Sequence, residues 1–152
     1  MNAHNFHATC VAFPQFNNPG VLLTGAPGIG KSSLALQLMD RGAKLVSDDQ
    51  TLLQPGAQGL IATAPEGLRQ LIEINGYGIV QLPDAACAPS AVLALYVALY
   101  PTEQAIDRMP EKLIHQVLTI PLRRANLHAH DPAAVAKIFA ILSYRLLDYT
   151  DA

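Results

Sequence analysis

Residues 21–49 read VLLTGAPGIGKSSLALQLMDRGAKLVSDD and contain the pattern that decides the fold. The apolar run Val21 to Thr24 is typical of a buried strand, and it leads into Gly25 to Ser32, which matches GxxxxGK[ST]. Apolar residues at helical spacing predict a helix over Ser32 to Arg41, with Gly42 as its stop. A strand, a glycine-rich loop and a helix in this order predict a phosphate-binding loop.

Each part of this loop suits a nucleoside triphosphate and Mg²⁺. Glycines let the backbone turn its N–H groups inward, and these amides bind phosphate oxygens together with the helix N-terminus. The ammonium of Lys31 suits the β and γ phosphates, and the hydroxyl of Ser32 suits Mg²⁺. We therefore expect ATP and Mg²⁺ to bind here. The expected nucleotide contacts are Gly25, Ala26, Pro27, Gly28, Ile29, Gly30, Lys31, Ser32 and Ser33.

Two carboxylates follow the next predicted strand, Lys44 to Val46, as Asp48 and Asp49. Ligand sites in open α/β sheets form beyond the carboxyl ends of strands. A carboxylate in that place can hold Mg²⁺ or accept a proton from an attacking hydroxyl. Neighbouring side chains on a strand point to opposite faces, so we expect different roles for the two aspartates. The sequence leaves open which of them is the base.

The length of 152 residues, with 51% hydrophobic and 14% charged residues, predicts one domain around one core. Its last helix is expected over Ala133 to Leu147, with Asp131 as N-cap and Pro132 at the first helical position. Further strands are expected at Ala8 to Phe13, Gln50 to Gln54, Leu60 to Ala62, Leu71 to Ile74, Ile79 to Leu82, Val92 to Tyr100 and Leu113 to Leu122.

Composition excludes several classes of partner. The net charge of -2 offers no basic excess for a nucleic-acid backbone. No apolar run approaches the ~18 residues that a membrane-spanning helix needs. The chain has no charged-then-apolar start, so we expect it in the cytoplasm. Its two cysteines form no CxxC pair, and they indicate neither a disulfide framework nor a metal site.

Taken together, five segments in one order resemble the catalytic domain of the HPr kinase/phosphorylase family. The motif quoted above, from Gly25 to Asp49, is similar to the family's phosphate loop, helix, arginine-glycine turn and double-aspartate strand. The other four segments are His7 to Cys10 (HATC), Ile72 to Val80 (IEINGYGIV), Ile106 to Arg108 (IDR) and Thr119 to Leu127 (TIPLRRANL). The resemblance covers nearly the whole chain, so we expect a short form that lacks the family's N-terminal domain.

The resemblance implies an α/β fold with a phosphate-loop kinase core of the HPr kinase / phosphoenolpyruvate carboxykinase type, a mixed β-sheet with flanking helices. Residues 1–152 would form a single ATP-binding catalytic domain. The family phosphorylates a serine of the phosphocarrier HPr and can remove that phosphate, and it is hexameric, so a homo-oligomer is expected. The implied metal ligands are Ser32 and Glu73. The implied catalytic residues are His7, Lys31, Asp48, Asp49 and Arg108.

Departures from the family pattern bear on the reverse reaction. Asn75 stands where the family usually has arginine, and Leu122 to Asn126 lacks the family's proline-glycine pair. An asparagine supplies no fixed positive charge, which weighs against dephosphorylation. Two alternatives remain open: a phosphate-loop NTPase or small-molecule kinase, and a degenerate nucleotide-binding regulatory module without transfer activity.

Overall fold

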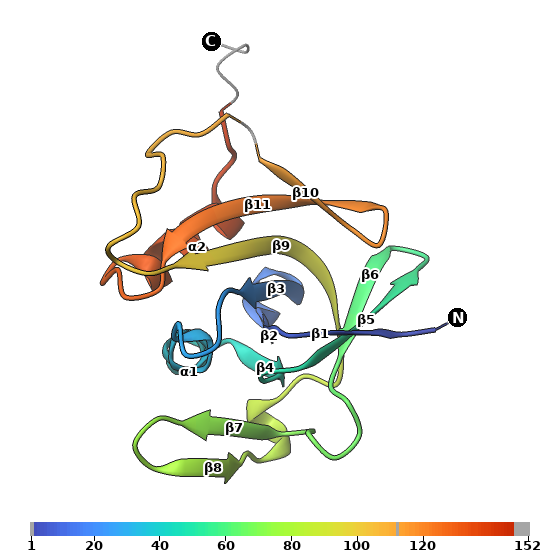
Figure 1. The fold of residues 1–152 in the computed structure, drawn as a ribbon. Coiled ribbons are helices and arrows are strands. Elements are labelled where there is room, and N and C mark those ends of the chain that lie inside the picture. The colour runs from blue at the N-terminus through green and yellow to red at the C-terminus, as the bar shows by residue number, and fades with distance from the viewer. Residues whose placement is uncertain (1, 112, 148–152) are drawn as a thin grey trace.

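A mixed sheet of nine strands lies at the centre of the computed structural model, which describes residues 2–111 and 113–147. Seven strands follow the order β1-β5-β6-β9-β3-β2-β4 (Figure 1). Of the other two, β11 pairs with β9, and β10 pairs with β11. The bounds of these strands are β1 His4–Phe6, β2 Thr9–Ala12, β3 Pro19–Thr24, β4 Lys44–Ser47, β5 Thr51–Gly56, β6 Gly59–Thr63, β9 Ala91–Tyr100, β10 Ile114–Val117 and β11 Ile120–His128.

Two helices and a separate hairpin complete the described fold. The helices are α1 (Lys31–Asp40) and α2 (Ala134–Ser143), and the hairpin pairs β7 (Leu71–Ile74) with β8 (Gly78–Gln81). Two short 3₁₀ helices are η1 (Pro14–Phe16) and η2 (Asp84–Ala86). The expected combination of a mixed sheet with flanking helices is confirmed. Neither helix in the described ranges is long and apolar enough to cross a membrane.

Strand β9 is the central strand of the sheet and is paired on both edges. It runs parallel to β3 along one edge and parallel to β11 along the other, where β6 pairs antiparallel with its first residues. A strand that is paired on both edges and covered on both faces must be apolar throughout. The sequence of β9, AVLALYVALY, meets this requirement and explains why it is the most apolar stretch of the chain.

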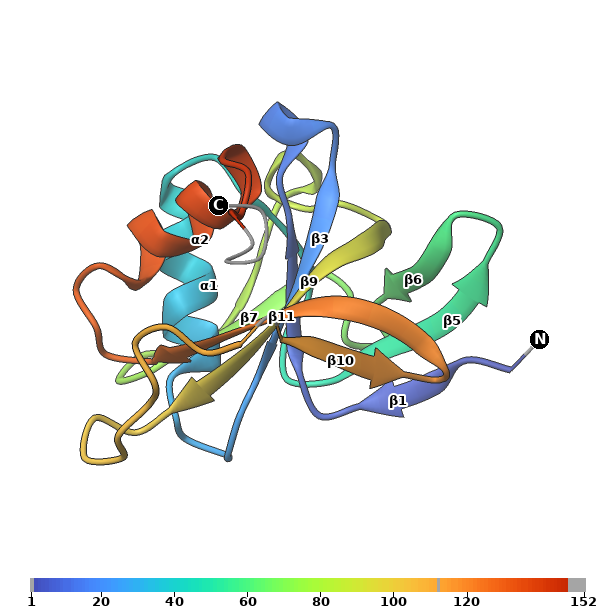
Figure 2. The ribbon, with the colours of Figure 1, turned by 90° about the horizontal axis from the view of Figure 1, so that it is seen from above.

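Apolar side chains fill both faces of the sheet. On one face, Val11 and Val21 pack with Leu34 of α1 and Ile138 of α2. Cys10 points to the opposite face, because side chains alternate along a strand. Figure 2 shows α1 and α2 side by side on one side of the molecule, with β5 and β6 on the other. The two buried layers fix β3 and α1, and with them the loop that joins them.

Two predicted elements are wrong in their extent. Leu113 to Leu122 is not one strand but a hairpin, in which β10 pairs antiparallel with β11. The turn lies at Leu118 and Thr119, which have φ of 49° and 69°. Glycine or asparagine usually mark such turns, and neither is present here. This absence explains why the sequence pattern hid the turn.

The last helix is also shorter than expected. It covers Ala134–Ser143 rather than Ala133 to Leu147, and its N-cap residue is Ala133 rather than Asp131. Asp131 still receives the N–H of Ala133 on Oδ1 at 2.8 Å, one turn ahead of the helix. The aspartate therefore stabilises the entry into α2 without being its cap.

Candidate active site

The loop between β3 and α1 has the shape of a phosphate cradle. Gly25 and Gly30 have φ of 149° and 117°, which side chains with a Cβ rarely adopt. A Cβ on Gly25 would also lie 2.9 Å from the carbonyl oxygen of Leu99. Gly30 caps α1 without any side-chain hydrogen bond to the helix. The first amides of α1 are thus free of side-chain caps, as binding to phosphate oxygens requires.

Lys31 is folded back onto this loop. Its Nζ donates to the carbonyl oxygens of Gly25 at 2.8 Å and Ala26 at 3.1 Å, and the residue is 6% exposed. Burial lowers the pKa of the Lys31 ammonium, and the charges of Asp49 and Asp48 act against that change. Phosphate oxygens are stronger acceptors than carbonyl oxygens because they carry charge. We therefore expect the Lys31 ammonium to leave the two carbonyl oxygens and bind phosphate oxygens when a nucleotide is present.

A cavity of about 450 Å³ opens beside the loop, and we call it the phosphate-loop cavity. Four separate segments of the chain contribute to its wall. They bring together most of the residues that the sequence indicated. The lining residues are His7, Thr9, Pro27, Gly28, Gly30, Lys31, Ser32, Ser33, Asp49, Glu73 and Asn75.

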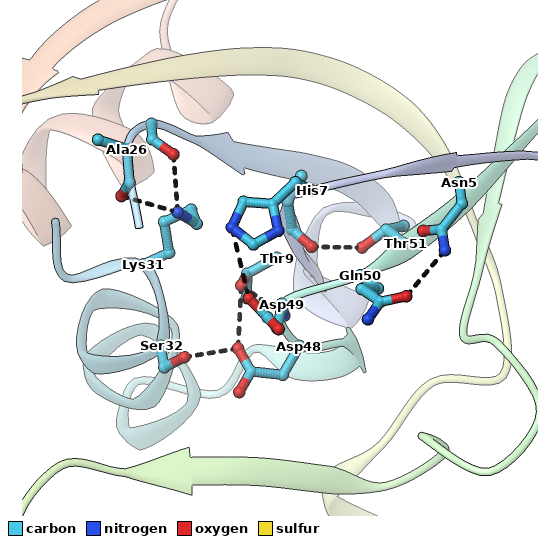
Figure 3. A network of polar contacts seen from close by, with 12 residues as sticks. Asn5, His7, Thr9, Ala26, Lys31, Ser32, Asp48, Asp49, Gln50 and Thr51 are labelled. Atoms are coloured by element: carbon cyan, nitrogen blue, oxygen red, sulfur yellow. Dashed lines mark hydrogen bonds and ion pairs between the residues drawn. The ribbon is translucent and has the colours of Figure 1, made fainter. Parts of the chain in front are cut away.

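Asp48 is buried and fully engaged. Its Oδ1 accepts hydrogen bonds from Ser32 Oγ at 2.7 Å and Thr9 Oγ1 at 2.9 Å, as Figure 3 shows. Its Oδ2 accepts the backbone N–H of Glu73 at 3.0 Å. Three donors on one carboxylate fix its position. Asp48 thus ties the start of α1, strand β2 and strand β7 into one unit.

Asp49 faces the cavity instead. One of its carboxylate oxygens lies 3.7 Å from Nε2 of His7, and both side chains are more than half exposed. The backbone of Asp49 has a φ of 68°, so the chain turns sharply between the two aspartates. The two side chains thus have different surroundings, and their different roles stay a prediction. One carboxylate is held by three donors, and the other is open to the cavity.

Glu73 and Asn75 enter the cavity from the β7 side. Among the described residues, no group of three or more His, Cys, Asp or Glu could hold a metal on its own. Mg²⁺ beside a nucleotide is usually held by one or two protein oxygens, with phosphate oxygens and water as the other ligands. The hydroxyl of Ser32 and the carboxylate of Glu73 are hard oxygen donors on the cavity wall, so the residues present fit Mg²⁺.

Arg108 lies elsewhere. It is exposed in the segment between β9 and β10 and lines a second cavity of about 500 Å³, bounded by β11 and α2. We call this the arginine cavity, because Arg108, Arg123, Arg124 and Arg145 line it. Arg108 is absent from the lining of the phosphate-loop cavity. Its catalytic role remains a prediction from the resemblance.

Thr9 is the residue of the cavity for which sequence analysis predicted no individual role. It is fully buried at the start of β2, and its hydroxyl contacts both aspartates. The only sequence signal is its position two residues after His7, within the HATC segment. Thr9 reaches the two aspartates because β2 pairs with β4, and the sequence pattern does not show this pairing.

Fold and site together define a phosphate-loop protein of the mixed α/β class. Comparison with known families narrows this class further: residues 2–145 match the family model described as HPr Serine kinase C-terminal domain. The chain belongs to that family. The fold expected from the resemblance is confirmed.

Relatives with curated names agree with this assignment. The HPr kinase/phosphorylase of Geobacillus thermodenitrificans is 34% identical over 139 residues, which are 84% of this chain and 44% of that protein. The protein of the same name from Lactococcus lactis subsp. lactis is 32% identical over 136 residues, 83% of this chain and 44% of that protein. This chain therefore spans less than half the length of these relatives.

A solved structure shows the same fold. The Hpr(Ser) kinase/phosphatase from Coxiella burnetii superposes with a TM-score of 0.76 at 26% sequence identity. The match covers 91% of this chain and 87% of that chain. The similarity thus extends over most of the fold.

Proposed function

We propose that this chain is a protein serine kinase, which transfers the γ phosphate of ATP to a serine of an HPr-type phosphocarrier. The observation that carries the proposal is one cavity with a phosphate loop on one wall and the carboxylate of Asp49 on another. Membership of the HPr Serine kinase family and the names of the relatives support the choice of acceptor. The chain is proposed to act as a single catalytic domain in the cytoplasm.

Asp49 is proposed as the base. A base must have a free lone pair within reach of the substrate, and Asp48 already accepts three hydrogen bonds. Asp49 instead opens into the cavity, next to His7. His7 is proposed to orient the Asp49 carboxylate. Asp48 is proposed to hold the Ser32 hydroxyl in place for Mg²⁺.

Phosphoryl transfer then needs little more than positioning and charge neutralisation. Lys31 and the amides of the loop hold the β and γ phosphates in line with the acceptor. The serine oxygen attacks the γ phosphorus while Asp49 takes its proton, and the bond to the β-phosphate oxygen breaks to release ADP. Mg²⁺, held by Ser32 and Glu73, would neutralise charge on the phosphates.

The same residues can run the reaction in the other direction. A protonated Asp49 would donate to the serine oxygen while the phosphoryl group passes from phosphoserine to the β-phosphate oxygen of ADP held by the loop. Asn75 lines the cavity at the position where the resemblance places an arginine. An asparagine adds no positive charge next to the phosphate. We propose that dephosphorylation by this chain is weak.

The experiment that tests the proposed function uses γ-labelled ATP, Mg²⁺ and purified HPr-type carriers from the same organism. We expect label on a carrier serine, and none when that serine is replaced by alanine. Hydrolysis of ATP without a labelled carrier would favour the NTPase alternative. Nucleotide binding with neither reaction would favour the regulatory module. Sedimentation of the same preparation tests the proposed homo-oligomer.

A further inference from the structure

The backbone between the two aspartates is strained. The N–H of Gln50 donates to the carbonyl oxygen of Asp48 at 2.7 Å, which closes a three-residue turn around Asp49. The φ of Asp49, 68°, belongs to the left-handed region that few residues other than glycine adopt. Three-residue turns with a positive central φ are rare and costly. Surrounding contacts must therefore hold Asp49 in this conformation.

The hydroxyl of Thr9 makes two contacts at this turn. Thr9 Oγ1 donates to Asp48 Oδ1 at 2.9 Å and accepts the backbone N–H of Asp49 at 3.1 Å. The directions are fixed, because a carboxylate only accepts and a backbone N–H only donates. The Thr9 hydroxyl thus uses its proton on Asp48 and a lone pair on Asp49, which are neighbours in the chain. Figure 3 shows Thr9 above the two aspartates.

No ladder pairing secures Asp49 in its place. Strand β2 pairs with β4 from Cys10 opposite Ser47 onward, and the ladder ends there. Thr9 stands one residue beyond this last pair on β2, and Asp49 lies two residues beyond it on the other chain segment. The threonine hydroxyl accepts the Asp49 N–H where the sheet no longer supplies a carbonyl.

We propose that Thr9 is a positioning residue that couples the metal side of the cavity to the base. Through Asp48 its hydroxyl is linked to Ser32, and through the Asp49 N–H it holds the turn that directs the base into the cavity. The proposal rests on the proposed function, because it assigns the base to Asp49. It adds a group that does not itself touch the reacting atoms.

The simpler interpretation is that Thr9 is only a buried hydroxyl with its hydrogen bonds satisfied. Thr51 provides the matched comparison within the same molecule. It is also fully buried, and its Oγ1 donates to the carbonyl oxygen of Ala8 at 2.9 Å without touching either aspartate. If burial alone matters, the two threonines respond alike to loss of the hydroxyl. If Thr9 positions the base, only Thr9 affects turnover.

The experiment compares Thr9→Val, Thr9→Ser and Thr51→Val in the full chain. Valine keeps the shape but removes the hydroxyl, and serine keeps the hydroxyl. For Thr9→Val we expect kcat for carrier phosphorylation to fall about 10- to 100-fold, because small misplacements of a catalytic group cost that much. Binding of ATP without Mg²⁺ should stay within about twofold, since Thr9 makes no hydrogen bond to the phosphate loop.

Amide exchange at Asp49 is the second readout, and it does not need activity. In Thr9→Val the Asp49 N–H loses its acceptor and should exchange at least about tenfold faster, whereas Thr51→Val leaves its rate unchanged. Thr9→Ser keeps the hydroxyl, so its kcat and its rate of amide exchange at Asp49 should both stay close to those of the wild-type chain. Equal kcat in Thr9→Val and Thr51→Val, or unchanged exchange at Asp49, would overturn the proposal. If the wild-type chain labels no carrier, the proposed function fails, and the exchange rates still decide whether Thr9 holds the turn.

Discussion

The phosphate-loop cavity and the arginine cavity are similar in volume, about 450 and about 500 Å³, but they are built differently. The first is lined by glycine backbone and by side chains at the ends of strands β1, β4 and β7. The second lies between β11 and α2, with apolar side chains and four arginines in its wall. Acidic and basic side chains line both cavities, but only the first combines them with a phosphate loop. The comparison shows that the phosphate loop, Asp49 and Glu73 share one cavity, whereas Arg108 lines the other.

Arg124 illustrates the character of the arginine cavity. Its guanidinium donates to Tyr100 Oη at 2.8 Å and Asn126 Oδ1 at 2.9 Å, and lies 3.1 Å from Nδ1 of His115. Its ring partner is Tyr96, with the guanidinium 5.6 Å from the ring centroid. These contacts are with neutral acceptors and a ring, which suits a structural arginine. The four predictions that follow test the contrast between the two cavities, in order of decreasing effect.

Lys31→Ala should abolish transfer to the carrier. The β and γ phosphates lose their cation, and we expect a fall of at least about 10³-fold in kcat/KM. Labelled phosphate on the carrier serine is the measurement. Lys137→Ala is the matched control, because this lysine of α2 is half exposed, pairs with Asp131 ahead of that helix and does not line the cavity. Transfer by Lys31→Ala at the wild-type rate would remove the phosphate loop from the site.

Replacing each aspartate by asparagine should affect different properties: Asp49→Asn should lower activity, and Asp48→Asn should lower stability. Asp49→Asn should lower kcat by about 10²- to 10⁴-fold, since it removes the base, and leave the urea midpoint nearly unchanged because the side chain is exposed. Asp48→Asn cannot accept all three hydrogen bonds equally well, and it should lower the free energy of unfolding by about 1–3 kcal/mol. Steady-state kinetics and urea unfolding on both variants provide the measurements. Normal turnover in Asp49→Asn would assign the base to another group.

Arg108→Ala tests whether the two cavities work together. A guanidinium that stabilises the transferring phosphate is worth about 10³-fold or more. From its place in the arginine cavity, we expect kcat to fall by less than about threefold. Arg123→Ala on the same cavity wall is the control for a general effect on folding. A loss comparable to that of Lys31→Ala would mean that Arg108 reaches the phosphate during turnover.

His115 should make the stability of the folded chain weakly sensitive to acid. Burial, followed by the charge of Arg124, lowers the pKa of His115 from its ordinary value of 6.5. The unfolded chain therefore binds this proton at higher pH than the folded chain, so stability is complete above 6.5 and is lost as pH falls below it. Urea unfolding at pH 7.5 and 5.5 should show a small loss, and His115→Gln should reduce it. An equal loss in both chains would place the sensitive group elsewhere.

Most of the fold could be predicted from local patterns, and the failures have specific physical causes. The strand before the loop, helix α1 and the β7–β8 hairpin follow from periodicity and glycine positions within short segments. The β10–β11 turn was hidden because Leu118 and Thr119 adopt positive φ without a glycine. Strand β1 was missed because its pairing with β5 depends on residues nearly 50 positions away. Such pairings leave little trace in a single sequence.

The sequence by itself determined the phosphate loop, because all eight residues of the motif are contiguous and their backbone conformation follows from the glycines. It also placed Ser32, the aspartate pair and Glu73 near one another through the family order. Only the tertiary structure decided which aspartate opens into the cavity, that Thr9 binds both, and that Arg108 lies elsewhere. These facts depend on a positive φ at one residue and on contacts about 40 positions apart, and packing of the whole sheet fixes both.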